Sequence, residues 1–217
     1  MFLRKSSKLA DERCAKIIIE DIRQKQGGSR HHLSNLKKRR KKSMIQKIPL
    51  GSTSIAEAGV PFLYINGEDD ETYIGDVNGS ILVHFGKLSA AGTSLLISLL
   101  ATGHIREERL CMAAVIGMGG DKDEATRYAS RPATVTPMDS IATDEGSLAL
   151  LAIVAGRDTC ICRTDARPVL MFDGIGMWGN ALLADLLVRG FIFDNEKCMD
   201  AELAMMKEMY TCQEEDA

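Results

Sequence analysis

The sequence predicts an α+β fold, in which one body of mixed strands and helices follows a basic N-terminal arm. Three observations support this prediction. Residues 1–47 carry 15 Lys/Arg and 4 Asp/Glu, a net charge of +11, whereas the other 170 residues carry 12 and 26, a net charge of −14. After the arm, short runs with strand periodicity are mixed with longer runs with helix periodicity. These runs do not alternate as regular β-α-β units, which favours α+β over α/β.

The arm, residues 1–47, opens with a candidate amphipathic helix over 9–26. Apolar residues recur there at every fourth position, while charged residues occupy the other face. Gly27-Gly28 would end this helix. The apolar positions that define the stripe are Cys14, Ile18 and Ile22, with Ala15 and Ile19 beside them.

The rest of the arm, 29–47, has almost no apolar residues, so we expect it to be disordered when unbound. A polar linker over 48–59 would then lead to the α+β body, residues 60–217.

Six consecutive cations within the arm form a candidate polyanion-binding or nuclear-import site. Such a run repels itself, stays extended and attracts a polyanion. Nucleic acid or nucleoprotein, importin and anionic membrane all suit it. Because 29–47 contains no Phe, Tyr or Trp to stack on bases, binding to RNA would be electrostatic and non-specific. The six residues are Lys37, Lys38, Arg39, Arg40, Lys41 and Lys42.

The body opens with strand signals. Runs at 61–66 and 72–76 flank an acidic turn and predict a hairpin, and alternating apolar residues predict a strand over 79–88. Ser89 is a suitable N-cap for a leucine-rich helix over 90–102.

The middle of the body gives weaker signals. Residues 110–118 fit a buried strand or a short helix, and 147–156 fit either as well. The polar stretch 119–146 contains Pro132 and Pro137, which predicts a long loop.

The last third alternates between short apolar runs and helical patterns. Strands are expected at 159–164 and 168–172, a helix at 179–190, a short strand at 191–194 and a terminal helix over 200–211.

A G-x-G-x-x-G motif joins a predicted strand to a predicted helix, as in dinucleotide-binding proteins. Gly174, Gly176 and Gly179 form it, and Asp194 lies twenty residues beyond the first glycine. That acid follows only a short strand, and few residues remain to build a sheet around the motif. A tight strand-to-helix turn is therefore the preferred interpretation, with a small nucleotide- or dinucleotide-binding enzyme as the alternative. No cofactor and no catalytic residue are predicted otherwise.

The six cysteines include no C-x-x-C pair, and the first residues do not resemble a signal peptide, which favours reduced thiols in a cytosolic or nuclear protein. Cys160 and Cys162 should face the same way on a strand, but no second pair with ligand spacing accompanies them. No metal site is predicted, and no apolar run is long enough to span a bilayer.

The layout resembles that of matrix proteins of negative-strand RNA viruses, the rhabdovirus type in particular. The resemblance is carried by the arm with "KKRRKK", by "ILVHFGKLSAAGTSLLISLL" and by "MWGNALLADLLVRGFIFDNEK". It implies a virion protein that condenses nucleocapsids, contacts anionic membrane and enters the nucleus in some hosts.

The sequence thus predicts a non-enzymatic structural protein, located in the nucleus and cytoplasm of a host cell and in the virion. Its arm would bind polyanions or importin, and its body would self-associate as a homo-oligomer. Because the body is acidic, it could also attract the arms of neighbouring copies, giving head-to-tail assembly. A viral movement or coat protein with a similar arm is a further alternative.

Overall fold

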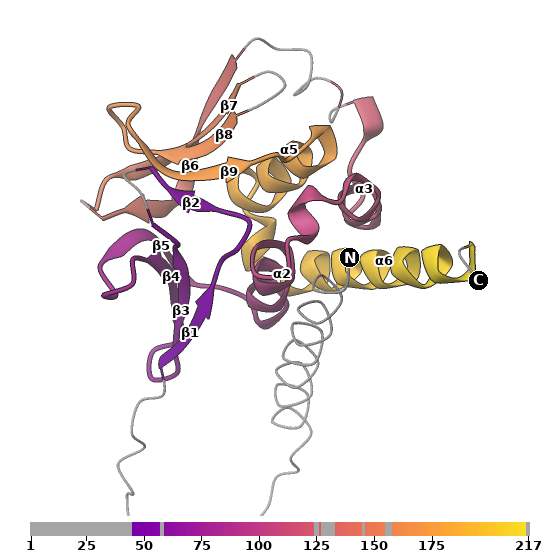
Figure 1. Ribbon diagram of the computed structural model, residues 1–217, viewed down its shortest axis with the longest axis horizontal. Coiled ribbons are helices and arrows are strands. Elements are labelled where there is room, and N and C mark those ends of the chain that lie inside the picture. The colour runs from indigo at the N-terminus through magenta and orange to yellow at the C-terminus, as the bar shows by residue number, and fades with distance from the viewer. Residues whose placement is uncertain are drawn as a thin grey trace, which may run out of the picture. The chain divides into compact units, whose positions relative to one another are not determined.

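The computed structural model has a body that combines an antiparallel sheet with helices, as the α+β prediction requires (Figure 1). The structure describes residues 45–56, 59–123, 126, 133–144, 146–154 and 158–215, with side chains through Thr211 in the last helix. These residues belong to one unit, 44–217. The predicted helix 9–26 and the basic run 37–42 lie outside the described residues.

The sheet of the described residues has nine strands in the order β1-β3-β4-β5-β6-β7-β8-β9-β2, and every pair is antiparallel. The strands are β1 (Ile45–Pro49), β2 (Ser54–Ile55), β3 (Phe62–Asn66), β4 (Glu71–Gly75), β5 (Ile81–Lys87), β6 (Ala133–Thr143), β7 (Leu148–Val154), β8 (Asp158–Cys162) and β9 (Pro168–Asp173).

This sheet must be strongly curled, because its two edge strands are neighbours in the sequence. Only residues 50–53 separate β1 from β2, and such a link spans at most about 17 Å. In a flat sheet, eight strand spacings would place the two edges roughly 38 Å apart. Figure 1 shows β2 next to β9 in one half of the sheet and β1 next to β3 in the other.

Helices cover one side of this curled sheet (Figure 1). The π-helix contacts β6 and β7, whereas the last helix packs mainly on α2 and α3 and so forms an outer layer. The helices are α2 (Ala90–Leu100), α3 (Glu108–Gly117), α5 (Met177–Leu183) and α6 (Asn195–Glu215), with the 3-10 turns η1 (His104–Arg106) and η3 (Phe191–Phe193) and the π-helix η2 (Ala184–Val188). None of the helices in these ranges is long and apolar enough to cross a membrane.

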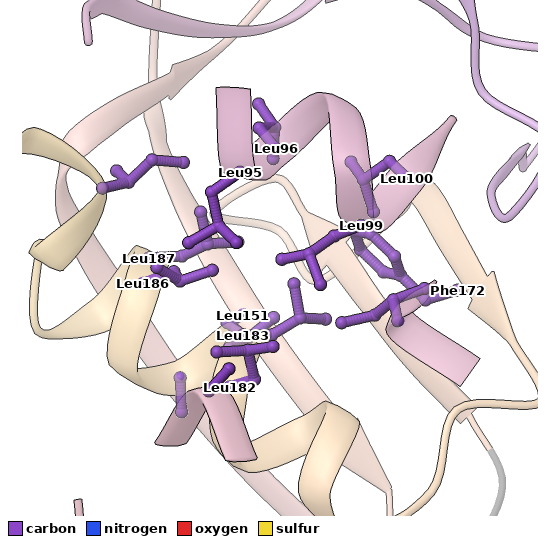
Figure 2. Packing of buried hydrophobic residues seen from close by; sticks show 14 of the residues in the cluster. Leu95, Leu96, Leu99, Leu100, Leu151, Phe172, Leu182, Leu183, Leu186 and Leu187 are labelled. Carbon is purple, nitrogen blue, oxygen red and sulfur yellow. The ribbon is translucent and has the colours of Figure 1, made fainter. Parts of the chain in front are cut away.

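The core lies where α2 and the α5–η2 helix face the sheet. Leucines from both helices meet there, together with side chains of β7 and β9 such as Leu151 and Phe172 (Figure 2). All of them are buried, as the leucine-rich helical patterns at 90–102 and 179–190 predict. The labelled residues are Leu95, Leu96, Leu99, Leu100, Leu151, Phe172, Leu182, Leu183, Leu186 and Leu187.

The stretch predicted as a linker, 48–59, contains parts of the sheet instead, and so do the last residues of the arm, 45–47, which were expected to be disordered. β1 begins at Ile45 and pairs with β3, and β2 pairs with β9 through Ile55 and Leu170. Local sequence patterns did not reveal either strand, because each is an edge strand whose pairing partner lies elsewhere in the chain.

The long loop predicted over 119–146 is also wrong in its second half, which forms β6. Pro137 sits within that strand, opposite Leu150 of β7. β5 pairs with β6 only at Ala142 and Thr143, so the edge of β6 that faces β5 is not paired with it at Pro137. Proline, which has no backbone N–H, is tolerated at such a position.

Three shorter predictions are settled by local geometry. Residues 110–118 fall largely within helix α3, and 147–156 contain strand β7. Residues 191–194, predicted as a short strand, form the 3-10 turn η3 after Gly190, whose φ is +75°.

Candidate functional site

The glycine motif makes the strand-turn-helix connection that the sequence predicts. β9 ends at Asp173, Gly174 turns the chain with φ of +69°, and α5 begins at Met177. However, both neighbours of β9 in the sheet, β8 and β2, are antiparallel to it. A dinucleotide-binding fold places this turn in a parallel sheet, so the sheet argues against that alternative.

The N-terminus of α5, where a dinucleotide phosphate would bind, already holds a carboxylate of the chain itself. Oε2 of Glu108, at the start of α3, accepts the backbone N–H of Trp178 at 3.1 Å. A Cβ atom on Gly176 would lie 1.4 Å from Oε1 of the same carboxylate. Gly176 therefore makes room for an internal anion that complements the helix dipole.

The remaining residues of the motif also have structural roles. A Cβ atom on Gly179 would lie 2.7 Å from the backbone oxygen of Ile105, so this glycine lets α5 approach η1 closely. Oδ1 of Asp194 accepts the backbone N–H groups of Glu196 and Lys197, at 3.0 and 3.2 Å, and so caps α6. The geometry thus accounts for Gly174, Gly176, Gly179 and Asp194 without a nucleotide.

A second convergence of polar groups, which the sequence did not predict, surrounds the buried Asp185 in the π-helix η2. Its side chain is 6% exposed, and its Oδ1 accepts from Nη1 of Arg189 at 3.0 Å. The Arg189 guanidinium lies 5.1 Å from the ring centre of Phe191, and Lys197 Nζ lies 5.7 Å from that ring. Lys197 also donates to the backbone oxygen of Met118 at 2.9 Å.

This cluster connects the end of α3 to η2, η3 and the start of α6. A buried carboxylate is tolerated when it is paired and hydrogen-bonded, so the arrangement fits a structural connection between elements. The available sequence signal was an acid inside a leucine-rich helical run with an arginine four residues later. Glu108 gave no such signal, because its partner lies 70 residues away.

Two thiols on β8, those of Cys160 and Cys162, lie next to each other. As strand alternation predicts, Cys160 and Cys162 lie on the same side, with their Sγ atoms 3.3 Å apart. The hydrogen bond from Cys162 lowers the pKa of Cys160, and the same bond raises the pKa of Cys162. In the described ranges, no group of three or more His, Cys, Asp or Glu residues is placed to hold a metal ion.

We expect Cys160 to be alkylated by iodoacetamide at neutral pH at least roughly fivefold faster than the buried thiols Cys111 and Cys198, because the thiolate is the reacting species. Burial raises the pKa of both of those thiols to about 12. Rates for each cysteine follow from peptide mass spectrometry. Cys162→Ala removes the donor and should raise the pH at which Cys160 reacts half-maximally, while Cys162→Ser keeps a donor. An unchanged pH profile in Cys162→Ala would contradict the assigned hydrogen bond.

The candidate polyanion site, Lys37 to Lys42, lies outside the residues that the structure describes. The structure does show part of the acidic surface of the body. The tip of the β3–β4 hairpin exposes four acidic residues, Glu68, Asp69, Asp70 and Glu71. Lys87 Nζ lies 3.0 Å from Asp70 and His84 Nε2 lies 3.4 Å from Glu71, so this tip retains an excess of acid.

No family model, no curated protein and no solved structure matches this chain.

Proposed function

We propose that this protein is a non-enzymatic structural protein of the viral matrix type, which binds polyanions through its basic arm and self-associates through its acidic body. The observation that carries the proposal is the division of charge, +11 over residues 1–47 and −14 over the rest. RNA or nucleoprotein is the proposed partner in the virion. Importin and anionic membrane would use the same cations in the nucleus and cytoplasm of the host.

The chemistry of the body supports two separate roles, polyanion binding by the arm and self-association by the body. Its surface carries exposed acids such as those of the β3–β4 hairpin, which repel phosphate. The turn that most resembled a cofactor site is occupied by Glu108, which favours a scaffold over an enzyme. Polyanion affinity would then reside in the six cations at 37–42.

The test measures binding of the full chain to single-stranded RNA of mixed sequence at about 50 and 200 mM salt. Six phosphate contacts, at roughly −0.7 each, give a slope of log K against log salt near −4, or about a 300-fold loss over this range. Replacing all six cations at 37–42 by glutamine should abolish binding at the lower salt concentration.

The matched control exchanges every lysine for arginine and every arginine for lysine in the same run. Because this variant keeps all six charges, non-specific binding should survive in it. Salt-independent binding, or binding that survives the glutamine variant, would overturn the proposal. If the full chain fails to bind RNA even at low salt, the RNA role is lost, and parallel tests with importin and with anionic vesicles assign the run.

A further inference from the structure

Helix α6 presents apolar residues on two faces. Its inner face is buried against the body through Cys198, Ala201 and Met205. A Cβ atom on Gly117 of α3 would lie 2.7 Å from the Cβ of Ala204, so α3 and α6 pack closely. Figure 1 shows α6 (yellow) running past α3, with its C-terminal part extending beyond the other elements of the body.

The outer face carries a regular stripe of large apolar side chains that are exposed. Met199, Leu203, Met206 and Tyr210 are 56, 52, 40 and 64% exposed. They follow one another at intervals of four, three and four residues. This is the spacing of residues that form the seam between two packed helices. Exposed apolar side chains that gather along one face are typical of an interaction site, so we expect this stripe to pack against a partner.

We propose that two copies of the chain associate by packing these stripes against each other, with the two α6 helices antiparallel. A two-fold axis between Leu203 and Met206 sets Leu203 of one copy against Met206 of the other, and Met199 against Tyr210. Each large side chain thus meets another large side chain. The inference rests on the self-association in the proposed function and gives that self-association a surface.

Charge complementarity argues for a second copy and for this direction. Asp200 and Lys207 are both exposed, and their seven-residue separation places them on the same flank of the stripe. In an antiparallel two-fold pair, equal flanks face each other, so Asp200 of each copy meets Lys207 of the other. The axial offset is ~3 Å, within reach of a lysine side chain. A parallel pair would set this flank against the opposite one and would not bring Asp200 to Lys207.

The first experiment measures the mass of the full chain by sedimentation or light scattering across a concentration series, at about 0.1 and 1 M NaCl. One pair of helices buries a small interface, so we expect a dissociation constant on the order of micromolar. Because the seam is largely apolar, the dimer should persist at high salt. Leu203→Glu with Met206→Glu should raise the dissociation constant at least tenfold.

The matched control, Val60→Glu with Val77→Glu, adds the same charge at exposed apolar positions away from α6, and should leave the dimer intact. A second pair of variants tests the direction of the helices. Asp200→Lys alone should weaken the dimer, and adding Lys207→Asp should restore it. Because all of these positions are exposed, we expect each variant to fold, and circular dichroism checks that it does.

The outcomes separate this inference from the proposed function. If the oligomer dissociates at high salt and the α6 variants do not change it, the copies assemble through arms and acidic bodies. That result is consistent with self-association and overturns the α6 interface. A chain that is monomeric under every condition overturns both. An α6-dependent dimer that ignores the Asp200 and Lys207 exchange overturns the antiparallel arrangement.

Discussion

Replacing Gly92 by alanine is expected to lower the free energy of unfolding by about 3 kcal/mol. Gly92 lies in the first turn of α2, where its N–H donates to Oγ of the N-cap Ser89 at 2.8 Å. A Cβ atom there would lie 2.0 Å from the backbone oxygen of Ile192 in η3 and 2.7 Å from Ser89 Oγ. Ser89 Oγ itself donates to that Ile192 oxygen, so the new methyl group has no room to settle.

Helix propensity alone would give the opposite sign, because alanine is favoured over glycine by about 1 kcal/mol within a helix. The steric effect is larger, since the closest neighbour is backbone rather than a flexible side chain. Urea unfolding followed by circular dichroism measures the difference. Gly51→Ala is the control: nothing lies within 4 Å of its new Cβ atom, so the change should be neutral or stabilising by up to about 1 kcal/mol. Equal stability of the two variants would show that α2 and η3 are not packed as described.

Replacing Phe172 by alanine is expected to cost about 3–5 kcal/mol, a large part of the stability of an ordinary domain. Its side chain is 1% exposed and lies beneath α2, where Leu99 also points into the core (Figure 2). The loss combines the transfer of the ring to water with the cavity left between helix and sheet. For a chain of this size, the midpoint of thermal unfolding should fall by roughly 10 °C.

Phe172→Leu keeps most of the volume and should cost less than about 1.5 kcal/mol, so the two variants together measure the cavity. The salt dependence of RNA binding should be the same in both, because the proposed contacts lie in the arm. If Phe172→Ala changed the slope of log K against log salt, the body would have to take part in binding. That result would contradict the division of labour between arm and body.

The elements that local signals specify could be predicted from the sequence. The β3–β4 hairpin follows from an acidic turn between two apolar runs, and α2 from leucine periodicity after Ser89, whose Oγ does cap the helix. Strands β8 and β9 and the helix after Gly174 were likewise expected, and all are present. In each case the information lies within about a dozen neighbouring residues.

The rest depends on contacts between distant residues. β2 is a strand only because Ile55 meets Leu170, and Pro137 is compatible with β6 only because β5 stops pairing before it. In the same way, the glycine motif resembles a phosphate site until Glu108 is brought to Trp178. The role of the six cations at 37–42 remains a prediction from composition.

The placement of β1 and β2 at opposite edges of the sheet also determines the order in which the strands can pair while the chain is being synthesised. β1, β3, β4 and β5 can pair soon after they leave the ribosome, but Ile55 must wait for Leu170, about 115 residues later. At roughly 5–20 residues per second, that delay is on the order of 6–23 seconds. During this interval the nascent chain exposes an unfinished apolar sheet, while the cations at 37–42 have already been synthesised. The polyanion or import receptor that we propose as partner of the arm would therefore meet these cations before the body has folded.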